Sequence, residues 1–544
     1  MSGAGERMSW GVSGMAERCA RGLAWAADRI NPILVKEVRQ ALKSRQFVVT
    51  FALLLICGWI WSILGLAIMG PEAAYGVHGA DMFAGYYVIL AFPLLVIVPF
   101  GAFRSLAGEQ EDRTYELLSI TALSPRQIVG GKLASAVVEM LIYLSAISPC
   151  LAFTYMLRGV SFPSVLFAVA CLFFTSLAFS VIGLLVGTLS SEKHWQVVLS
   201  VLLVVGLFLA FWLACRLMFE GVWFEIPFGE TWFWQGAAGW MTAYVTYFAL
   251  VFYAAVARIT FESDNRSTRL RAIMAFQHVC CVGWIAWIVA AVEPAIELLL
   301  VFLSFAGAHW YVMGALMTGE SPRLSLRVRR QLPQSFLGRA FLTWFNPGPA
   351  TGYMFAACGS LAALVLAGLG IWIREAFAGS GIRPWNAGEI EAVLAFGALV
   401  ACYLVIYLGL GLLVLRLLRR LGQGGWLLAV IVHPALLAVG IGVPLVIQLT
   451  SAAMRSAGYS LLQISNPFWT LAEIGDRPTL PLEAPLLLTL LPLAAAVVFV
   501  LNLPGIVREV RYVRIATPRR VAEEDAELHP ETRPAEPMRA SPWD

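Results

Sequence analysis

The 544-residue chain contains few charged side chains and none of the common motifs of a soluble enzyme. Only 13% of its residues are Asp, Glu, Lys or Arg and 59% are hydrophobic, whereas charged residues make up about 25% of an average soluble domain. It has no phosphate-binding G-x-x-x-x-G-K-[ST] loop, no H-E-x-x-H or G-x-S-x-G motif and no paired cysteine motif. The sequence therefore argues against a soluble protein and predicts a chain that is not an enzyme and binds no cofactor or metal directly.

The cysteines and the N-terminal residues exclude further classes. All nine cysteines except Cys19 lie inside apolar runs, where a thiol behaves as a small hydrophobic group and a disulfide framework is not expected. Charged residues interrupt the first thirty positions, so these lack the apolar core of a cleavable signal peptide and are expected to form a cytosolic tail over 1–30. The net charge of only +4 gives no indication of nucleic-acid binding.

Apolar runs fill most of the chain, and a helix needs about 20 such residues to span a bilayer. The expected spans are 47–69, 82–103, 132–157, 164–189, 195–218, 236–258, 272–292, 296–317, 352–373, 389–415, 426–449 and 481–506. The fold class that follows is an all-α polytopic membrane protein with about twelve transmembrane helices.

The distribution of basic residues predicts the orientation of these spans. Cytosolic loops of membrane proteins carry an excess of Lys and Arg. If both termini are cytosolic, 32 of the 38 Lys and Arg residues fall on the cytosolic side. The last cytosolic segment, 508–544, is rich in charged residues and proline, which predicts disorder.

Residues 31–46 have the pattern of a helix that lies in the membrane interface. Pro32 suits the first helical turn. One stripe is apolar and consists of Leu34, Val38, Ala41 and Leu42. The basic residues are Lys36, Arg39, Lys43 and Arg45, which can extend toward the headgroups of membrane lipids. The alternative is an ordinary basic flank of the first span.

A charged cytosolic stretch, residues 104–132, separates the second and third spans. A helical pattern of charged residues leads into an apolar pair and a Ser124-Pro125 turn, which ends one helix and caps the next. We expect a compact docking surface of two short helices. Its candidate contact residues are Glu109, Glu111, Asp112, Arg113, Glu116, Leu117, Leu118, Arg126 and Lys132.

Over about residues 31–260, the order of these elements resembles that of permeases of type-2 ATP-binding-cassette (ABC) exporters. In that family an acidic helix, a Leu-Leu pair, a Leu-Ser-Pro turn and a Gly-Lys pair follow the second span. Here these elements are Glu116-Leu117-Leu118, Leu123-Ser124-Pro125 and Gly131-Lys132. The resemblance implies an exporter permease in the plasma (inner) membrane and a separately encoded ATPase subunit that binds ATP and Mg²⁺. It also implies that the ATPase contacts the 104–132 stretch and the interface helix.

An aromatic segment lies between the fifth and sixth spans, on the outer side. Its candidate outer-gate residues are Trp223, Phe228, Trp232 and Trp234. Two interpretations are open. The rings suit an aromatic belt at the headgroup boundary, whereas the resemblance to type-2 permeases implies a re-entrant hairpin that closes the outer mouth of a pathway.

Two ionisable residues lie deep within expected spans. Glu139 is seven residues beyond Lys132, which is about 10 Å of helical rise, and His433 directly precedes Pro434. Each is a candidate functional group, because an ionisable side chain inside a membrane is costly. The structural alternative is favoured for both residues: a pair with a neighbouring helix for Glu139, and a hydrogen bond near the Pro434 kink for His433.

The sequence allows two origins for the second set of six spans, over 261–507. Both halves have a basic loop between their second and third spans, and both loops contain Ser-Pro-Arg, at 124–126 and 321–323. The second half is either a diverged copy of the 47–260 domain or an accessory domain. A diverged copy predicts one chain with two ATPase subunits, whereas an accessory domain predicts a homodimer paired through its first halves.

Two functions from other classes also suit the sequence. One is a proton-coupled secondary transporter that uses Glu139 and His433. The other is a membrane scaffold that keeps a permease-like fold and transports nothing.

Overall fold

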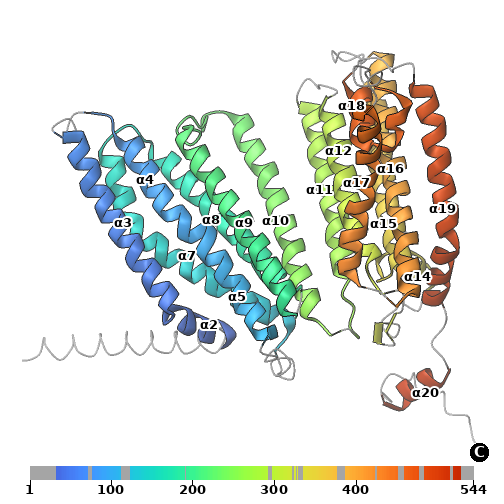
Figure 1. The fold of residues 1–544 in the computed structure, drawn as a ribbon, viewed down its shortest axis with the longest axis horizontal. Coiled ribbons are helices and arrows are strands. Elements are labelled where there is room, and N and C mark those ends of the chain that lie inside the picture. Colours follow the sequence, from blue (N-terminus) through green and yellow to red (C-terminus); the bar gives the residue numbers. More distant parts are fainter. Residues whose placement is uncertain are drawn as a thin grey trace, which may run out of the picture. The chain divides into compact units, whose positions relative to one another are not determined.

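The computed structural model shows helices joined by turns along most of the chain (Figure 1). The residues that the structure describes are 32–70, 76–111, 123–189, 192–261, 263–291, 297–321, 324–325, 327–328, 335–376, 386–422, 425–450, 459–476, 483–514 and 519–528.

Twelve helices of these residues are long and apolar enough to span a membrane, and the described part of the chain contains no β-strand. The spans are Arg45–Met69, Gly79–Glu111, Pro125–Met156, Phe162–Gly187, Lys193–Phe219, Thr231–Ile259, Thr268–Trp287, Glu297–Thr318, Pro349–Ala376, Ala387–Arg420, Trp426–Thr450 and Ala484–Arg511. Each coincides with one apolar run of the sequence. The prediction of an all-α polytopic membrane protein with twelve spans is confirmed.

The helices form two compact units, Met1–Thr260 and Phe261–Asp544. Each unit contains six spans and its own cluster of buried apolar side chains.

The first unit starts with a short helix and continues with its six spans. Its helices are α2 (Pro32–Leu42), α3 (Arg45–Met69), α4 (Gly79–Phe92), α5 (Val98–Glu111), α7 (Pro125–Met156), α8 (Phe162–Gly187), α9 (Lys193–Phe219) and α10 (Thr231–Ile259). Figure 1 shows the long helices running side by side, with α2 beside the start of α3. Ile33 anchors α2, because it is buried in a cluster with apolar residues of α5, α7, α8 and α10.

The second span changes helix type near its centre. Pro93–Ile97 form a π-helical turn, η2, between α4 and α5. Proline cannot donate a backbone hydrogen bond to the preceding turn, and a wider turn is one way for a helix to continue past such a break. The Ser176 hydroxyl of α8 donates to the carbonyl of Leu94 at 2.5 Å, so α8 satisfies one polar group of this turn.

Two glycines allow α8 to lie directly against α5. A Cβ on Gly183 would meet the Pro99 carbonyl oxygen at 2.5 Å, and one on Gly187 would meet the Phe103 carbonyl oxygen at 2.9 Å. Residues four apart share one helix face, and small residues there let two backbones approach closely in a membrane. These glycines therefore serve helix packing.

The second unit also has six spans, together with short helices. Its helices are α11 (Thr268–Ala291), α12 (Glu297–Thr318), α14 (Phe336–Leu342), η3 (Thr343–Phe345), α15 (Pro349–Ala376), α16 (Ala387–Arg420), α17 (Trp426–Thr450), η5 (Leu461–Ser465), α18 (Pro467–Gly475) and α19 (Ala484–Arg514). The central helix is α16, which packs on α12, α15, α17, α18 and α19. Two of its tyrosines, Tyr403 and Tyr407, donate hydrogen bonds to carbonyls of η5.

The six spans of both units share one order of neighbours. In each unit the second span packs on the first, third, fourth and fifth, and the fourth span packs on the second, third, fifth and sixth. The third span of each unit also packs on the first and on the sixth. The two units therefore share the same set of neighbouring pairs of spans, which is the packing that a diverged copy predicts.

The interface helix is shorter than the sequence pattern suggests. α2 ends at Leu42, Lys43 lies in the following turn, and Arg45 is the first residue of α3. The cause is Ser44, whose side chain accepts a hydrogen bond from the Phe47 amide and so caps α3. Arg45 therefore belongs to the first span.

The 104–132 stretch also differs from a pair of short helices. Its beginning, up to Glu111, continues α5, and its end, from Pro125, is the first part of α7. Ser124 and Gln127 form a capping box that starts α7. The residues Asp112, Arg113, Glu116, Leu117 and Leu118 lie outside the described part of the chain.

Part of the C-terminal tail is helical where the composition suggests disorder. α19 continues through Arg514, and a separate helix, α20 (Arg519–Leu528), follows. The buried contacts of Glu509 described below hold the end of α19. In α20, oppositely charged residues four positions apart, such as Arg520 and Glu524, favour a helix.

A labelling experiment tests the predicted orientation of the spans. Single cysteines on the outer side of a cysteine-free chain should react with an impermeant thiol reagent in intact cells. Those on the inner side should react only after permeabilisation. The outer positions are Val77, Glu230 and Ala387, the inner ones are Lys193, Arg269 and Arg420, and all are exposed. Inverted labelling of any position after 260 would contradict the twelve-span order.

Candidate functional site

A buried lysine joins three helices at one end of the first unit. The Lys132 ammonium group of α7 lies 3.1 Å from Glu37 Oε1 of α2 and 3.0 Å from Glu109 Oε1 of α5. It also donates to the Ser105 carbonyl at 2.9 Å. The Lys132 side chain is only 1% exposed. We call Lys132, Glu37 and Glu109 the Lys132 junction.

The chemistry of the junction explains how a lysine can be buried there. An ammonium group has three hydrogens to donate, and the two carboxylates and the Ser105 carbonyl supply three acceptors. A buried ammonium without such partners would be strongly disfavoured. This one cation therefore joins α2 to the ends of the second and third spans.

Other residues of the 104–132 stretch contact neighbouring helices at the surface. Glu111 forms an exposed ion pair with Lys193 of α9 at 3.0 Å. The Arg126 guanidinium carbon lies 5.2 Å from the ring centre of Tyr253 in α10, which is a cation–π geometry. The structure thus brings Glu109 and Lys132 together and places Glu111 and Arg126 elsewhere around the same end of the unit.

The basic residues of α2 face outward. Lys36 and Arg39 are exposed, as are Lys43 in the following turn and Arg45 at the start of α3. Ile33 is turned into the core of the unit. A helix with one apolar face packed inward and a basic face outward is suited to the boundary between membrane and water.

A cavity of about 640 Å³ extends from the junction into the first unit. It is bounded by α2, by the turn into α3, and by α5 and α7, and its wall includes Lys132 and Glu109. Farther along α7 the wall includes Glu139 and Tyr143. The cavity therefore connects the Lys132 junction with the intramembrane carboxylate of Glu139. Its volume is within the range of about 300–1,000 Å³ that is typical of small-molecule sites.

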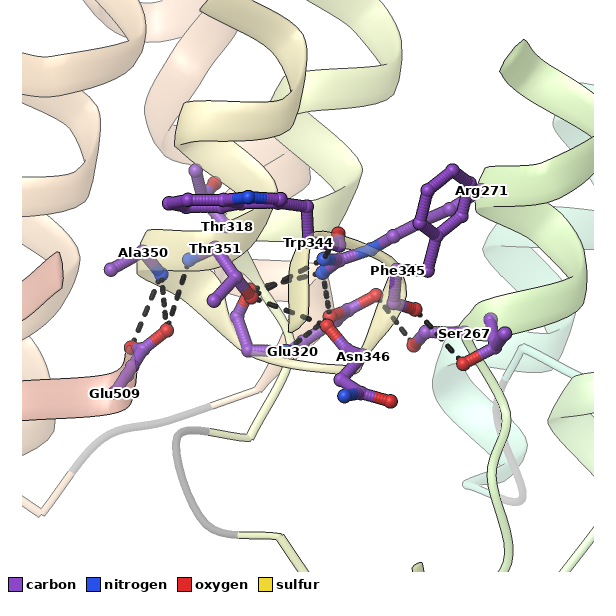
Figure 2. Close-up of polar contacts among 12 residues, drawn as sticks. Ser267, Arg271, Thr318, Glu320, Trp344, Phe345, Asn346, Ala350, Thr351 and Glu509 are labelled. Carbon is purple, nitrogen blue, oxygen red and sulfur yellow. Dashed lines mark hydrogen bonds and ion pairs between the residues drawn. The ribbon is translucent and has the colours of Figure 1, made fainter. Parts of the chain in front are cut away.

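A buried arginine forms a second junction in the second unit (Figure 2). Arg271 of α11 is fully buried. Its guanidinium group donates to Glu320 Oε2 at 2.6 Å, to the Trp344 carbonyl at 2.7 Å and to the Gly348 carbonyl at 3.1 Å. It also reaches Thr351 Oγ1 at 3.2 Å. We call Arg271 and Glu320 the Arg271 junction.

Glu320 connects three further groups at this end of the unit. Its carboxylate accepts hydrogen bonds from the Gly348 amide and the Ser267 hydroxyl, both at 2.7 Å. Arg419 of α16 donates to the backbone carbonyls of Thr318 and Glu320 at 2.7 and 3.2 Å, which satisfies acceptors at the end of α12. Both units therefore place a carboxylate at the end of the second span against a buried cation.

Glu509 of α19 holds the start of α15. Its carboxylate accepts from the amides of Ala350 and Thr351 at 2.9 and 3.0 Å. The first amides of a helix have no partner within the helix, and the positive end of the helix dipole favours an anion there. Figure 2 shows Glu509 approaching α15 from the side opposite to Arg271.

The outer aromatic residues fall into two groups. Trp223 and Phe228 both pack against Phe167 of α8, with ring centres 6.2 and 5.8 Å apart. Trp232 and Trp234 are 62% and 54% exposed. The exposed pair suits an aromatic belt, and the inner pair covers the start of α8.

No re-entrant hairpin forms between α9 and α10, where every residue is described. α9 extends to Phe219 and α10 begins at Thr231. Residues that a hairpin would need are thus part of the two spans, and only turns around Pro227 and Gly229 remain.

His433 is packed among the helices of the second unit. It is fully buried in α17, and its ring shares a hydrogen bond of 2.7 Å with the Thr318 hydroxyl of α12. Gly411 of α16 makes room for the ring, because a Cβ at that position would collide with it. A neighbouring helix therefore satisfies Nε2 of His433, as the structural interpretation expects, but Nδ1 is buried without a hydrogen-bond partner among the described residues. Glu139, in the first unit, lines a cavity.

The twelve apolar helices make this chain a multi-pass membrane protein of a kind suited to a transporter or a membrane scaffold. Comparison with models of protein families, with curated proteins and with solved structures gave no match.

Proposed function

We propose that this protein is the membrane-spanning permease of a type-2 ABC exporter in the plasma (inner) membrane. A separately encoded ATPase subunit binds ATP and Mg²⁺, and this chain converts closure of the ATPase into tilting of its spans. The observation that supports this function is the Lys132 junction, which ties the interface helix α2 to the ends of the second and third spans. A force applied to α2 reaches both spans through buried ion pairs.

The surface around the junction has the mixed character of a docking site. Lys36 and Arg39 are exposed on α2, and Val35 beside them is an exposed apolar residue. Protein interfaces combine an apolar centre with a polar rim. The gate residues of the proposal are Trp223 and Phe228, which contact Phe167 near the start of α8. A tilt of α8 would separate these two rings from Phe167.

A double substitution tests the docking of the ATPase. Glu116→Lys together with Leu117→Asp should reduce the ATPase that co-purifies with the chain by at least about tenfold, because it adds an unfavourable charge and a carboxylate to the proposed interface. The amount of inserted permease should not change. A matched control is Glu220→Lys with Val222→Asp in the turn after α9. Unchanged co-purification in the first variant would falsify ATPase docking at this stretch.

The shared packing order of the spans supports a chain that supplies both permease units. We therefore expect native mass measurement of the solubilised complex to show one chain with two ATPase subunits. A homodimer with two ATPase subunits would instead identify the second unit as an accessory domain. One feature of the sequence favours the homodimer: only the first of the two loops contains the acidic and Leu-Leu elements.

One observation favours a proton-coupled secondary transporter as a second candidate. Glu139 lies within a span and lines a cavity, as a proton-carrying carboxylate would. The second group of this mechanism, His433, is enclosed by neighbouring helices. Glu139 is therefore the one of the two groups that lines a cavity. Flux driven by a pH gradient in proteoliposomes without any ATPase would favour this candidate.

A further inference from the structure

We propose that the cavity of the first unit binds an organic cation with an apolar, aromatic body, and that Glu139 selects its positive charge. The inference rests on the proposed transport function and adds the class of ligand.

The walls of the cavity suit an amphiphilic molecule. The end at the Lys132 junction is polar, whereas Phe47, Ile97 and Val98 supply apolar surface deeper in the unit. Gly101 of α5 lies in the wall and leaves it open, because a Cβ there would meet no atom within 4 Å. A volume of about 640 Å³ is enough for a drug-sized ligand.

The described charged residues of the wall leave one carboxyl group, that of Glu139, without a basic partner at the deep end. The charged residues that line the cavity are Lys36, Glu37, Arg104, Glu109, Lys132 and Glu139. Within the junction, Lys132 is matched by two carboxylates, and Lys36 lies 3.9 Å from the second of these, Glu109. Arg104 is exposed. Glu139 forms no ion pair among the described residues, so a cationic group is the favourable occupant beside it.

The surroundings of Glu139 favour an organic cation over a metal ion. Tyr143 follows one turn later on the same face of α7, and its ring centre lies 5.5 Å from that of Phe47. Aromatic faces attract weakly hydrated organic cations. Divalent metals require several oxygen or nitrogen ligands, and the described residues contain no group of three or more His, Cys, Asp or Glu that could hold a metal ion.

Equilibrium binding of two probes of one shape tests this inference. Tetraphenylphosphonium is a hydrophobic cation and tetraphenylborate is its anionic counterpart. The full chain, purified in detergent without an ATPase, should bind the cation at least tenfold more tightly than the anion. Glu139→Gln should weaken cation binding at least tenfold, since it keeps the shape of the side chain and removes its charge.

Two further variants separate the cavity from other sites. Gly101→Phe should prevent binding of the cation, because Gly101 lines the cavity and has open space around its Cβ position, so that a phenyl ring there would take up part of the cavity. Glu230→Gln, at an exposed position before α10, should leave binding unchanged. Elution as a single folded species in size-exclusion chromatography shows that each variant is intact.

Three results would overturn the inference. These are equal affinity for the two probes, cation binding that Glu139→Gln does not affect, and absence of cation binding to the intact chain. A site blocked by Gly101→Phe but indifferent to Glu139→Gln would be a pocket for lipid tails. The proposed function has a separate readout. If the ATPase co-purifies and the cation does not bind, only the ligand class is refuted; if the cation binds and no ATPase associates, only the ABC mechanism is refuted.

Discussion

Replacing Lys132 with methionine is expected to destabilise the first unit by about 3–5 kcal/mol, the usual cost of removing one partner of a buried ion pair. Methionine keeps an unbranched side chain of similar length, so the loss reports mainly on the ammonium group. Glu37 and Glu109, whose side chains are only 12% and 14% exposed, would then face each other without the central cation. Thermal unfolding of the purified chain, followed by tryptophan fluorescence, should show a clearly lower midpoint.

Lys193 provides the matched control for this prediction. It lies 3.0 Å from Glu111, the same distance as between Lys132 and Glu109, but its side chain is 80% exposed. Exposed ion pairs contribute only about 0–1 kcal/mol, so Lys193→Met should barely move the midpoint. Adding Glu37→Gln and Glu109→Gln to Lys132→Met should recover part of the loss. Equal shifts of the unfolding midpoint for the two lysine variants would show that the buried Lys132 junction stabilises the unit no more than an exposed ion pair does.

Arg271→Met should have an effect of similar size on the second unit, again about 3–5 kcal/mol. The variant leaves the Glu320 carboxylate without its cation and removes the donor to the carbonyls of Trp344 and Gly348. Arg271→Lys should recover only part of the stability, because a compact ammonium group cannot reproduce the planar fork of a guanidinium. Amide hydrogen exchange should speed up at the start of α15 and at the end of α12.

The control for Arg271 lies two residues earlier in the same helix. Arg269 is exposed, and substitutions of exposed residues usually change stability by less than about 0.5 kcal/mol. Arg269→Met should therefore leave both the midpoint and the exchange rates near those of the parent. If Arg271→Met behaves like this control, the hydrogen bonds of the Arg271 junction do not hold the unit together.

The spans could be predicted because the bilayer imposes a simple rule on sequence. A segment must be apolar over about 20 residues, and its backbone must satisfy its own hydrogen bonds, which leaves a helix as the choice for a single segment. The ends were harder to predict. From the charge pattern alone, Arg45 belongs to the preceding interface helix. In the structure Ser44 caps the first span, so Arg45 becomes the first residue of that span.

The candidate site could be predicted only in part. Glu109 and Lys132 stand out as charged residues at span ends, but Glu37 resembles one more surface charge in a basic helix. Its partner Lys132 is 95 positions away. Arg271 likewise resembles a residue of a basic loop, although it lies within the first turn of α11. A sequence can indicate that a charge at such a position needs a partner, but the partner comes from a distant helix that only the packing brings near.

The π-helical turn at Pro93–Ile97 has a further consequence for the second span. Each residue of an α-helix turns the chain by about 100°, so one extra residue in a turn changes the phase of everything after it by that angle. α4 and α5 are therefore consecutive segments of one span whose side-chain directions differ by about a quarter turn. α4 packs on α3, α7 and α9, whereas α5 packs mainly on α8 and also on α7. Gly101 and the other α5 residues in the cavity wall owe their direction to this offset. Loss of a single residue from the turn would rotate them away, a change that no substitution in the wall could reproduce.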